Sequence, residues 1–336
     1  MKKAALCILI VFFIVLLHSG AHAQDQEIYV PDQTISLPGN SGYDYLSIDK
    51  INNRLYVSHG TTVYVIDLAN GKAVGSIDDM QGVHGIAIVN EVNKGFITDG
   101  KADAVVVFDL TAYKKITTIH LTGKKPDAIT YDPFSKKIFA FNGDSNNSSV
   151  IDINSLKEIA TVDLGGAPEF GVADGKGLIY NNLEDKNNLD VIDTKSMKVI
   201  HTYPLSPCGG PTGLALDKTN KRLFTVCREN KGMSVIDINT GKVITTVPIG
   251  AGVDAVAYDE RNKLIVVSNG DGTATIIKQE SADKYEVVQT LQTQVRAKTL
   301  ALDTKTHKIY LSAARFEEGT RTPVPGTFKV LVYKMK

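Results

Sequence analysis

The 336-residue sequence contains no tryptophan, has only three cysteines and carries no net charge. The 37 basic side chains are balanced by 37 acidic ones, which excludes a protein held on nucleic acid by a bulk positive charge. The absence of tryptophan excludes the repeat families whose signature requires that residue. Hydrophobic residues make up 43% of the chain and charged residues 22%, so a largely disordered chain is also excluded.

Linear catalytic signatures are absent as well. The sequence has no G-x-S-x-G elbow, phosphate-binding loop, dinucleotide fingerprint, H-E-x-x-H or C-x-x-C-H motif. Beyond the N-terminal segment it shows no sustained helical period. A site assembled from separate repeats would leave no linear motif, so these absences do not exclude an enzyme.

One long hydrophobic run stands at the N-terminus. Lys2 and Lys3 precede 12 apolar residues, Leu6–Leu17, and Ala21–Ala23 follows with small residues at the positions that a signal peptidase reads. We expect residues 1–23 to be a cleaved secretory signal, because about 20 apolar residues are needed to span a bilayer. Its removal takes away two lysines and no acid, which leaves a net charge of −2. The prediction is a bacterial periplasmic or secreted protein with no membrane span after signal removal.

A repeat runs through the rest of the chain. Each copy has an apolar residue, an aspartate, a polar turn and an alternating apolar strand, as in LDKTNKRLFT from Leu216 and YDERNKLIVV from Tyr258. From Asp132 onward these aspartates are 42 to 44 residues apart. The first series comprises Asp49, Asp132, Asp174, Asp217, Asp259 and Asp303, with Val89 in the equivalent place of the second unit. A second series within the units comprises Asp67, Asp109, Asp152, Asp193 and Asp237.

Each unit predicts four short strands. In the fifth unit they are Leu214–Asp217, Arg222–Cys227, Met233–Ile238 and Lys242–Pro248, separated by polar turns. Four antiparallel strands repeated seven times predict an all-β fold, a seven-bladed β-propeller that forms one domain over residues 24–336.

The two ends of the chain are expected to meet. The last unit has no room for a fourth strand after Tyr333, and Thr34–Gly39 reads like the fourth strand Thr245–Gly250 of another unit. An N-terminal strand at residues 33–37 would complete the last blade and remove an exposed sheet edge.

These units resemble the YVTN-type propeller repeat of the YncE-like proteins. The residues that carry the resemblance are Arg54–Ser58, Val63–Asp67, Lys221–Thr225, Ser234–Asp237 and Thr240–Lys242. The resemblance implies an exported binding or scaffold protein. Propeller relatives include lyases and lactonases, so it leaves the activity open.

A ring of polar residues stands five positions before each repeat aspartate, where the inner strands begin. Its members are Asp44, His84, Asp127, Glu169, Thr212, Asp254 and Lys298. Four carboxylates that converge on one axis repel each other, which suggests a cation or a donor-rich ligand at the mouth of the channel. The alternative is a solvated channel rim.

Polar residues at the ends of the second strands should reach the same face. We add His59, Asp99, Asn142, Arg228 and Asn269 to the ligand-binding candidates. No cofactor is indicated with certainty. A divalent cation held by His84, Asp127 and Glu169 is one hypothesis, and solvated side chains are the other. The polar turns 142–147 and 268–272 have calcium-binding residue types, but as hairpin turns they need no ion.

Two further features of this face have alternative interpretations. The connection over residues 315–326 is long, which is typical of lids and partner contacts and also of tolerated insertions. Cys208 and Cys227 approach the same face, and an oxidising compartment favours a disulfide between them over a thiol nucleophile.

The sequence therefore favours a monomeric binding or scaffold propeller. Its channel-mouth face would bind a small molecule, glycan or protein partner, without bulk nucleic-acid binding. The alternative is a metal-assisted lyase or lactonase-like hydrolase at the same face, with His84 as the base.

Overall fold

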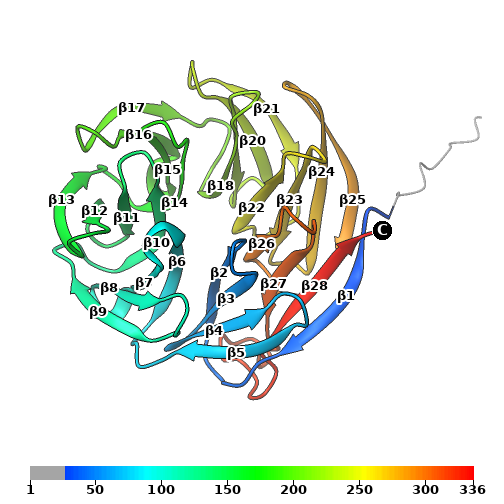
Figure 1. The fold of residues 1–336 in the computed structure, drawn as a ribbon. Coiled ribbons are helices and arrows are strands. Elements are labelled where there is room, and N and C mark those ends of the chain that lie inside the picture. Colours follow the sequence, from blue (N-terminus) through cyan, green and yellow to red (C-terminus); the bar gives the residue numbers. More distant parts are fainter. Residues whose placement is uncertain (1–26) are drawn as a thin grey trace, which may run out of the picture.

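The computed structural model describes residues 27–336, so the predicted signal at 1–23 lies outside the described residues. Seven four-stranded antiparallel sheets are arranged in a ring around a central axis, and they follow one another around the ring in chain order (Figure 1). This arrangement confirms the predicted all-β, seven-bladed β-propeller.

The strands of each blade follow one another from the channel outward. Blade one comprises β2 (Tyr43–Asp49), β3 (Arg54–His59), β4 (Thr62–Asp67) and β5 (Lys72–Ile77), and blade two β6 (Val83–Val89), β7 (Lys94–Asp99), β8 (Ala104–Asp109) and β9 (Lys115–His120). Blade three comprises β10 (Pro126–Asp132), β11 (Lys137–Asn142), β12 (Asn147–Asp152) and β13 (Lys157–Asp163), and blade four β14 (Pro168–Ala173), β15 (Leu178–Leu183), β16 (Asn188–Asp193) and β17 (Lys198–Pro204). Blade five comprises β18 (Pro211–Asp217), β19 (Arg222–Cys227), β20 (Gly232–Asp237) and β21 (Val243–Pro248), and blade six β22 (Ala255–Asp259), β23 (Leu264–Asn269), β24 (Thr273–Ser281) and β25 (Lys284–Gln292). Blade seven comprises β26 (Leu300–Leu302), β27 (Ile309–Ala313), β28 (Lys329–Met335) and, from the other end of the chain, β1 (Tyr29–Ser36).

The inner strands line the channel and close the ring. They contact one another in the order β2, β6, β10, β14, β18, β22, β26 and again β2. Short 3-10 turns η1 (Asn90–Val92), η2 (Gly100–Ala102) and η3 (Glu184–Lys186) connect strands within blades. Over residues 27–336, no helix has the length and hydropathy needed to cross a bilayer.

The hydrophobic core consists of seven layers, one between each pair of neighbouring blades. Phe108, for example, packs between blades one and two, and Phe224 between blades five and six. The second and third strands of a blade meet apolar neighbours on both faces, which explains why they read as nearly continuous apolar runs. The first strands line the channel with apolar and polar residues together, among them Ile88, Ile129, Thr130 and Leu216.

Both aspartate series form turns. The Asp49 carboxylate accepts hydrogen bonds from the backbone N–H groups of Ile51 and Asn52, each at 3.0 Å. Asp237 accepts from Asn239 at 2.8 Å and Thr240 at 3.1 Å. These turns lie at the end of the propeller opposite the polar ring, so the repeat signature stabilises the fold and leaves the chemistry to other positions.

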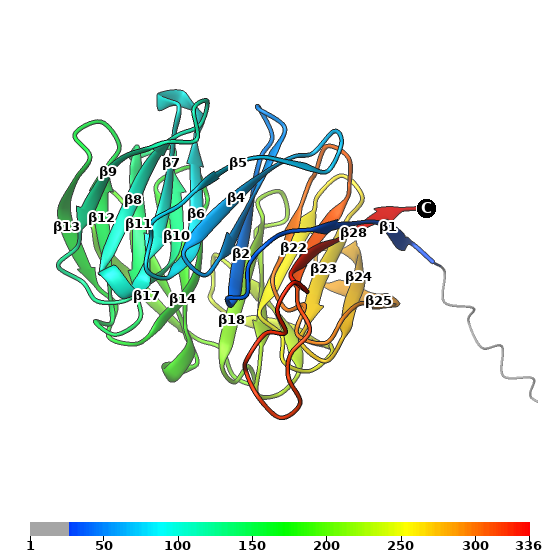
Figure 2. The same ribbon diagram turned by 90° about the horizontal axis from the view of Figure 1, so that it is seen from below.

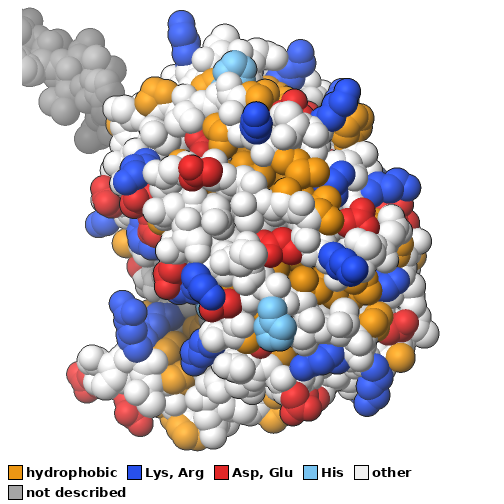
Figure 3. All heavy atoms as spheres, turned by 90° about the vertical axis from the view of Figure 1, so that its left-hand side faces the viewer, with side chains coloured by type: hydrophobic (Ala, Val, Ile, Leu, Met, Phe, Trp, Pro, Cys, Tyr) orange, Lys and Arg blue, Asp and Glu red, His pale blue; other side chains and the backbone are white. Residues whose placement is uncertain are grey.

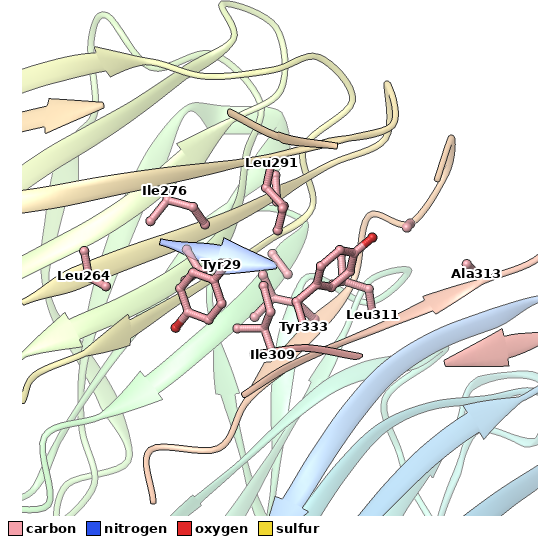
Figure 4. Packing of buried hydrophobic residues seen from close by; sticks show 13 residues of the cluster. Tyr29, Leu264, Ile276, Leu291, Ile309, Leu311, Ala313 and Tyr333 are labelled. Carbon is pink, nitrogen blue, oxygen red and sulfur yellow. The ribbon is translucent and has the colours of Figure 1, made fainter. Parts of the chain in front are cut away.

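The N-terminal strand closes the last blade, as predicted. β1 runs antiparallel to β28, with Tyr29 opposite Met335 and Ser36 opposite Lys329. The strand covers 29–36 instead of the predicted 33–37. The added residues are held by blade six, because Tyr29 is buried in the layer between blades six and seven (Figure 4). The Gln289 side chain also accepts from the backbone N–H groups of Ile28 and Tyr29, at 3.0 and 2.8 Å.

The outer strand of every blade contains a β-bulge. The residue that the register skips in blades one to five is an exposed aliphatic one: Val74, Ile116, Ile159, Ile200 and Ile244. In β1 the skipped residue is Asp32, which pairs with Lys308 at 2.7 Å and Lys334 at 3.0 Å. Bulges twist an edge and so hinder its pairing with another chain.

Candidate functional site

The polar ring lies at the mouth of the channel where the inner strands begin, and hydrogen bonds between blades fix its backbone. The Thr98 hydroxyl of blade two donates to the carbonyl of Asp127 in blade three, at 2.5 Å. The Ser268 hydroxyl of blade six donates to the backbone carbonyl of Lys298, at 2.5 Å, and the Thr299 hydroxyl of blade seven donates to the backbone carbonyl of Asp44, at 2.9 Å. Each of these bonds joins one blade to the ring residue of the next, so the side chains project from a rigid frame.

In one half of the mouth, the carboxylates of two aspartates lie close to the imidazole of one histidine. The imidazole Nδ1 of His84, in β6, lies 2.7 Å from Asp44 Oδ2 in β2 and 3.7 Å from Asp127 Oδ1 in β10. The three side chains are between 22% and 32% exposed. Asp127 Oδ1 itself is buried and has no hydrogen-bond partner within residues 27–336. This cluster contains two carboxylates and a single basic group.

The surroundings shift the protonation of this cluster. Burial alone would lower the pKa of His84, but the hydrogen bond to Asp44 and the charge of Asp127 outweigh it, so the pKa is raised. Burial and the charge of Asp44 raise the pKa of Asp127 to about 6. A positively charged His84 is therefore favoured, beside an Asp127 carboxyl that ionises less readily than an isolated aspartate.

Glu169 is the most perturbed carboxyl of the ring. Burial, the charges of Asp127, Glu184 and Asp254, and a hydrogen bond with Glu184 raise its pKa to about 9. At neutral pH Glu169 is therefore a neutral carboxylic acid that donates a hydrogen bond. Its partner Glu184, in η3, also pairs with Arg228.

The other half of the mouth is neutralised by its own ion pairs. Asp254 lies between Arg228, whose Nη2 is 2.7 Å from Asp254 Oδ1, and Lys298, which contacts Asp254 Oδ2. Burial lowers the pKa of Lys298, but the charge of Asp254 more than compensates and the pKa is raised. The mouth is therefore asymmetric, with unmatched acid at blades one to three and matched charges at blades five to seven.

Two aromatic side chains cross the channel just inside the mouth. The Tyr45 ring of blade one lies 5.7 Å from the Phe170 ring of blade four, and Tyr45 also packs against the core between blades three and four. Burial and the surrounding carboxylates raise the pKa of the Tyr45 hydroxyl well above its ordinary value, so the group stays protonated. The sequence reading missed this pair, although the position after each ring residue is otherwise small or Thr: Gly85, Ala128, Gly213, Ala255 and Thr299.

Several candidate residues are used by the fold. The Asp99 carboxylate accepts from the backbone N–H groups of Gln81 and Gly82, at 2.9 and 2.7 Å, and is 3% exposed. The His59 ring is buried and stacks on Phe328 with centroids 4.0 Å apart, and its burial lowers the pKa. These two side chains hold loops of the mouth face and do not reach the ring.

The remaining candidates are buried in hydrogen-bond networks. Asn142 donates to Asn147 at 2.8 Å, and Asn269 donates to Thr273 at 3.0 Å, each within a hairpin of its own blade. The Thr212 side chain is buried, and its backbone carbonyl accepts from Asn182 of blade four at 2.8 Å. Thr212 therefore takes a ring position without presenting its side chain to the channel.

A disulfide joins Cys208, in the loop before β18, to Cys227 at the end of β19. The backbone N–H of the next residue, Arg228, donates to the carbonyl of Gly210 in the same loop, at 3.0 Å. The cross-link thus holds the residue next to Arg228, the arginine that pairs with Asp254 and Glu184.

The long connection between β27 and β28 extends beyond the ring (Figure 2). It contacts the start of β2, because the rings of Phe316 and Tyr43 are 6.1 Å apart. It also contacts the loop before β26, where the Arg296 guanidinium lies 4.2 Å from the Phe316 centroid. A cavity of about 260 Å³, which the long connection does not line, opens beside Asp44 and His84 between loops of blades one and two. On the side of the molecule that lies at the left of Figure 1, basic and acidic side chains are interspersed (Figure 3).

Comparison with known proteins gives one weak relationship to report. No protein-family model matches the chain. A stretch of 188 residues, 54% of this chain, is 26% identical to Antigen Lp49 of Leptospira interrogans. The matched stretch spans 41% of that protein, less than half of its length.

Proposed function

We propose that the protein is an exported β-propeller that binds a small molecule, glycan or peptide at the channel mouth. The acidic half of the ring would bind a cationic group of that ligand. The observation that carries the proposal is the charge asymmetry of the ring. Asp44 and Asp127 share the single base His84, whereas Asp254 is matched by both Arg228 and Lys298. A positively charged ligand group would relieve the repulsion in the acidic half.

The neighbouring groups suit a ligand that also forms hydrogen bonds. The Tyr45 hydroxyl stays protonated and can donate, and the Tyr45–Phe170 pair offers an aromatic surface. The cavity of about 260 Å³ beside Asp44 has room for a small polar group. Amines of polyamines, amino sugars and basic peptides have this chemistry.

Export and membership of the YVTN-type, YncE-like repeat family belong to the same proposal. They are supported by the signal-like N-terminus and the repeat residues, and by the partial similarity to Antigen Lp49. Mass spectrometry of the protein recovered from a periplasmic fraction and from the medium tests export and distinguishes the two compartments. The predicted N-terminus is Gln24.

A thermal-shift panel of polyamines, amino sugars and basic peptides tests the binding site. A ligand at 100 times its dissociation constant should stabilise the wild type by about 2.7 kcal/mol. Asp127→Asn/Glu169→Gln should abolish that gain and still fold, with unchanged or slightly higher stability without ligand, because repulsion is relieved. Asp144→Asn is a matched control, since Asp144 is exposed on a nearby loop and pairs with Lys125 at 3.4 Å. Equal shifts in wild type and double variant would place the site elsewhere.

A second candidate is a lyase or hydrolase with His84 as general base. It is favoured by the 2.7 Å contact from Asp44, which would orient the imidazole and stabilise its protonated form. A panel of lactone and uronide substrates tests this function. His84→Asn should lose at least a hundredfold in kcat/KM on any substrate turned over. Undiminished turnover in this variant would contradict the role of His84.

A further inference from the structure

We infer that Asp44, His84 and Asp127 form a binding site for one divalent metal ion that accepts both nitrogen and oxygen ligands. Among residues 27–336 these three offer ligand atoms that all lie within 4.8 Å of one another. They come from blades one, two and three, so the site exists only in the closed ring. The inference rests on the acidic half of the mouth described under the proposed function, and it gives that half a metal ion as its occupant in place of an amine of the ligand.

The separations are near those of ligands around one ion, since all three atoms lie within 4.8 Å of one another. Atoms bound at about 2.0–2.2 Å in tetrahedral or octahedral geometry are about 3.0–3.5 Å apart. His84 Nδ1 is 2.7 Å from Asp44 Oδ2 and 3.7 Å from Asp127 Oδ1, so binding one ion requires the first pair to separate and the second to approach by about half an ångström each. An imidazole with two carboxylates suits Zn²⁺, Mn²⁺ or Fe²⁺ better than Ca²⁺ or Mg²⁺, which prefer all-oxygen sites.

A separate observation is the unused oxygen of Asp127. An ion pair between His84 and Asp44 would satisfy both of those groups and explain their contact without a metal. It leaves Asp127 Oδ1 buried beside them with no hydrogen-bond partner in the described part of the chain. Buried carboxylate oxygens are rarely left unpaired, and an ion is one of the groups that satisfies them.

The ligand set differs from the one that the sequence suggested. Glu169 does not join the group, and Asp44 takes its place. Glu169 instead shares a hydrogen bond with Glu184. An ion on Nδ1 of His84 would take the place of the proton that this nitrogen shares with Asp44, so the metal site and a base oriented by Asp44 exclude each other at this nitrogen.

Calorimetric titration of the chelator-treated protein with Zn²⁺ and with Mn²⁺ tests the site. We expect one ion per chain, and at least tenfold weaker binding in each of Asp44→Asn, His84→Gln and Asp127→Asn. Asp144→Asn, on the same face, should bind as the wild type does. Glu169→Gln distinguishes the two ligand sets, because it should retain at least a third of the wild-type affinity. A tenfold loss there with no loss in Asp44→Asn would overturn the assignment.

Pulsed electron paramagnetic resonance of Mn²⁺ on the wild type provides a measurement that does not depend on how the variants fold. One coordinated imidazole nitrogen should appear and should be lost in His84→Gln. Absence of a nitrogen coupling, or of stoichiometric binding of either metal, would contradict the inference. Amine ligands that stabilise the wild type without any metal would then leave the proposed function standing alone. Metal binding without amine binding would support the inference and contradict the amine ligand.

Discussion

Glu169 illustrates how the ring changes the chemistry of a single side chain. Its carboxyl group lies beside Glu184 and near two further aspartates, in surroundings that disfavour charge. An isolated glutamate is ionised at neutral pH, whereas this one keeps its proton and becomes a donor. The folded state therefore binds a proton that the unfolded chain releases.

This difference predicts a pH-dependent cost. The raised pKa of about 9 means that Glu169 disfavours folding as the pH rises above the ordinary glutamate value of 4.5. Glu169→Gln should therefore raise the melting temperature by a few degrees at pH 8, and the gain should disappear near pH 4, where both states are protonated. Calorimetry of both proteins across this range measures the effect. A gain of equal size at pH 4 and pH 8 would show that titration is not its cause.

For single residues, the sequence predicted which positions form the polar ring, but not which of their side chains lie in contact. Counting five residues back from a repeat aspartate found Asp44, His84 and Asp127, because every unit uses the same strand geometry. The same count also selected Thr212, and the ends of the second strands added Asp99; both side chains bond to backbone groups instead. Whether a polar side chain faces the channel or a neighbouring loop depends on contacts between blades, which the spacing within one repeat does not contain.

Among the elements, β1 carries the closure of the ring. Tyr29 is 1% exposed and packs in the layer between blades six and seven (Figure 4). Tyr29→Ala should cost about 3 kcal/mol, because a large aromatic side chain is removed from a packed layer. Removal of residues 27–36 should lower the melting temperature by several degrees, since the outer edge of β28 is then exposed.

Thermal melts of these two variants test the closure. Ile116→Thr is the control, because Ile116 lies at an exposed bulge and should change stability by less than about 0.5 kcal/mol. A truncated protein that melts like the wild type would show that β1 does not stabilise the ring.

The disulfide is predicted to stabilise the loop that precedes β18. Cys208 and Cys227 are 19 residues apart, and a loop of this size gives about 3 kcal/mol in the chain-entropy account. Cys208→Ser/Cys227→Ser should therefore melt several degrees lower than the wild type in the absence of reductant. Reductant should lower the melting temperature of the wild type and leave the double variant unchanged. No effect of reductant on the wild type, with free thiols detected, would contradict the cross-link.

Strand positions were predictable because turn and strand residues alternate within every unit. Arg222–Cys227 was predicted with the bounds that β19 has. The start of β1 was missed, because Tyr29 and Ile28 are held by Gln289, some 260 residues away in the chain. The bulges of the outer strands were also missed, since they depend on register between strands.

At the scale of the whole molecule, the two ends of the channel serve different purposes. One end carries the buried turn aspartates that define the repeat, and the other carries side chains that differ from blade to blade. The repeat thus builds a rigid ring, and departures from the repeat place unmatched acid on one side of the mouth. The central claim is that this acidic side of the mouth binds a cation.

Anomalous diffraction from crystals soaked in Zn²⁺ tests this claim most directly. We predict an anomalous peak about 2.0–2.2 Å from Asp44 Oδ2, His84 Nδ1 and Asp127 Oδ1, and its loss in crystals of Asp127→Asn. An empty channel mouth in crystals that hold Zn²⁺ at other surface sites would contradict the account.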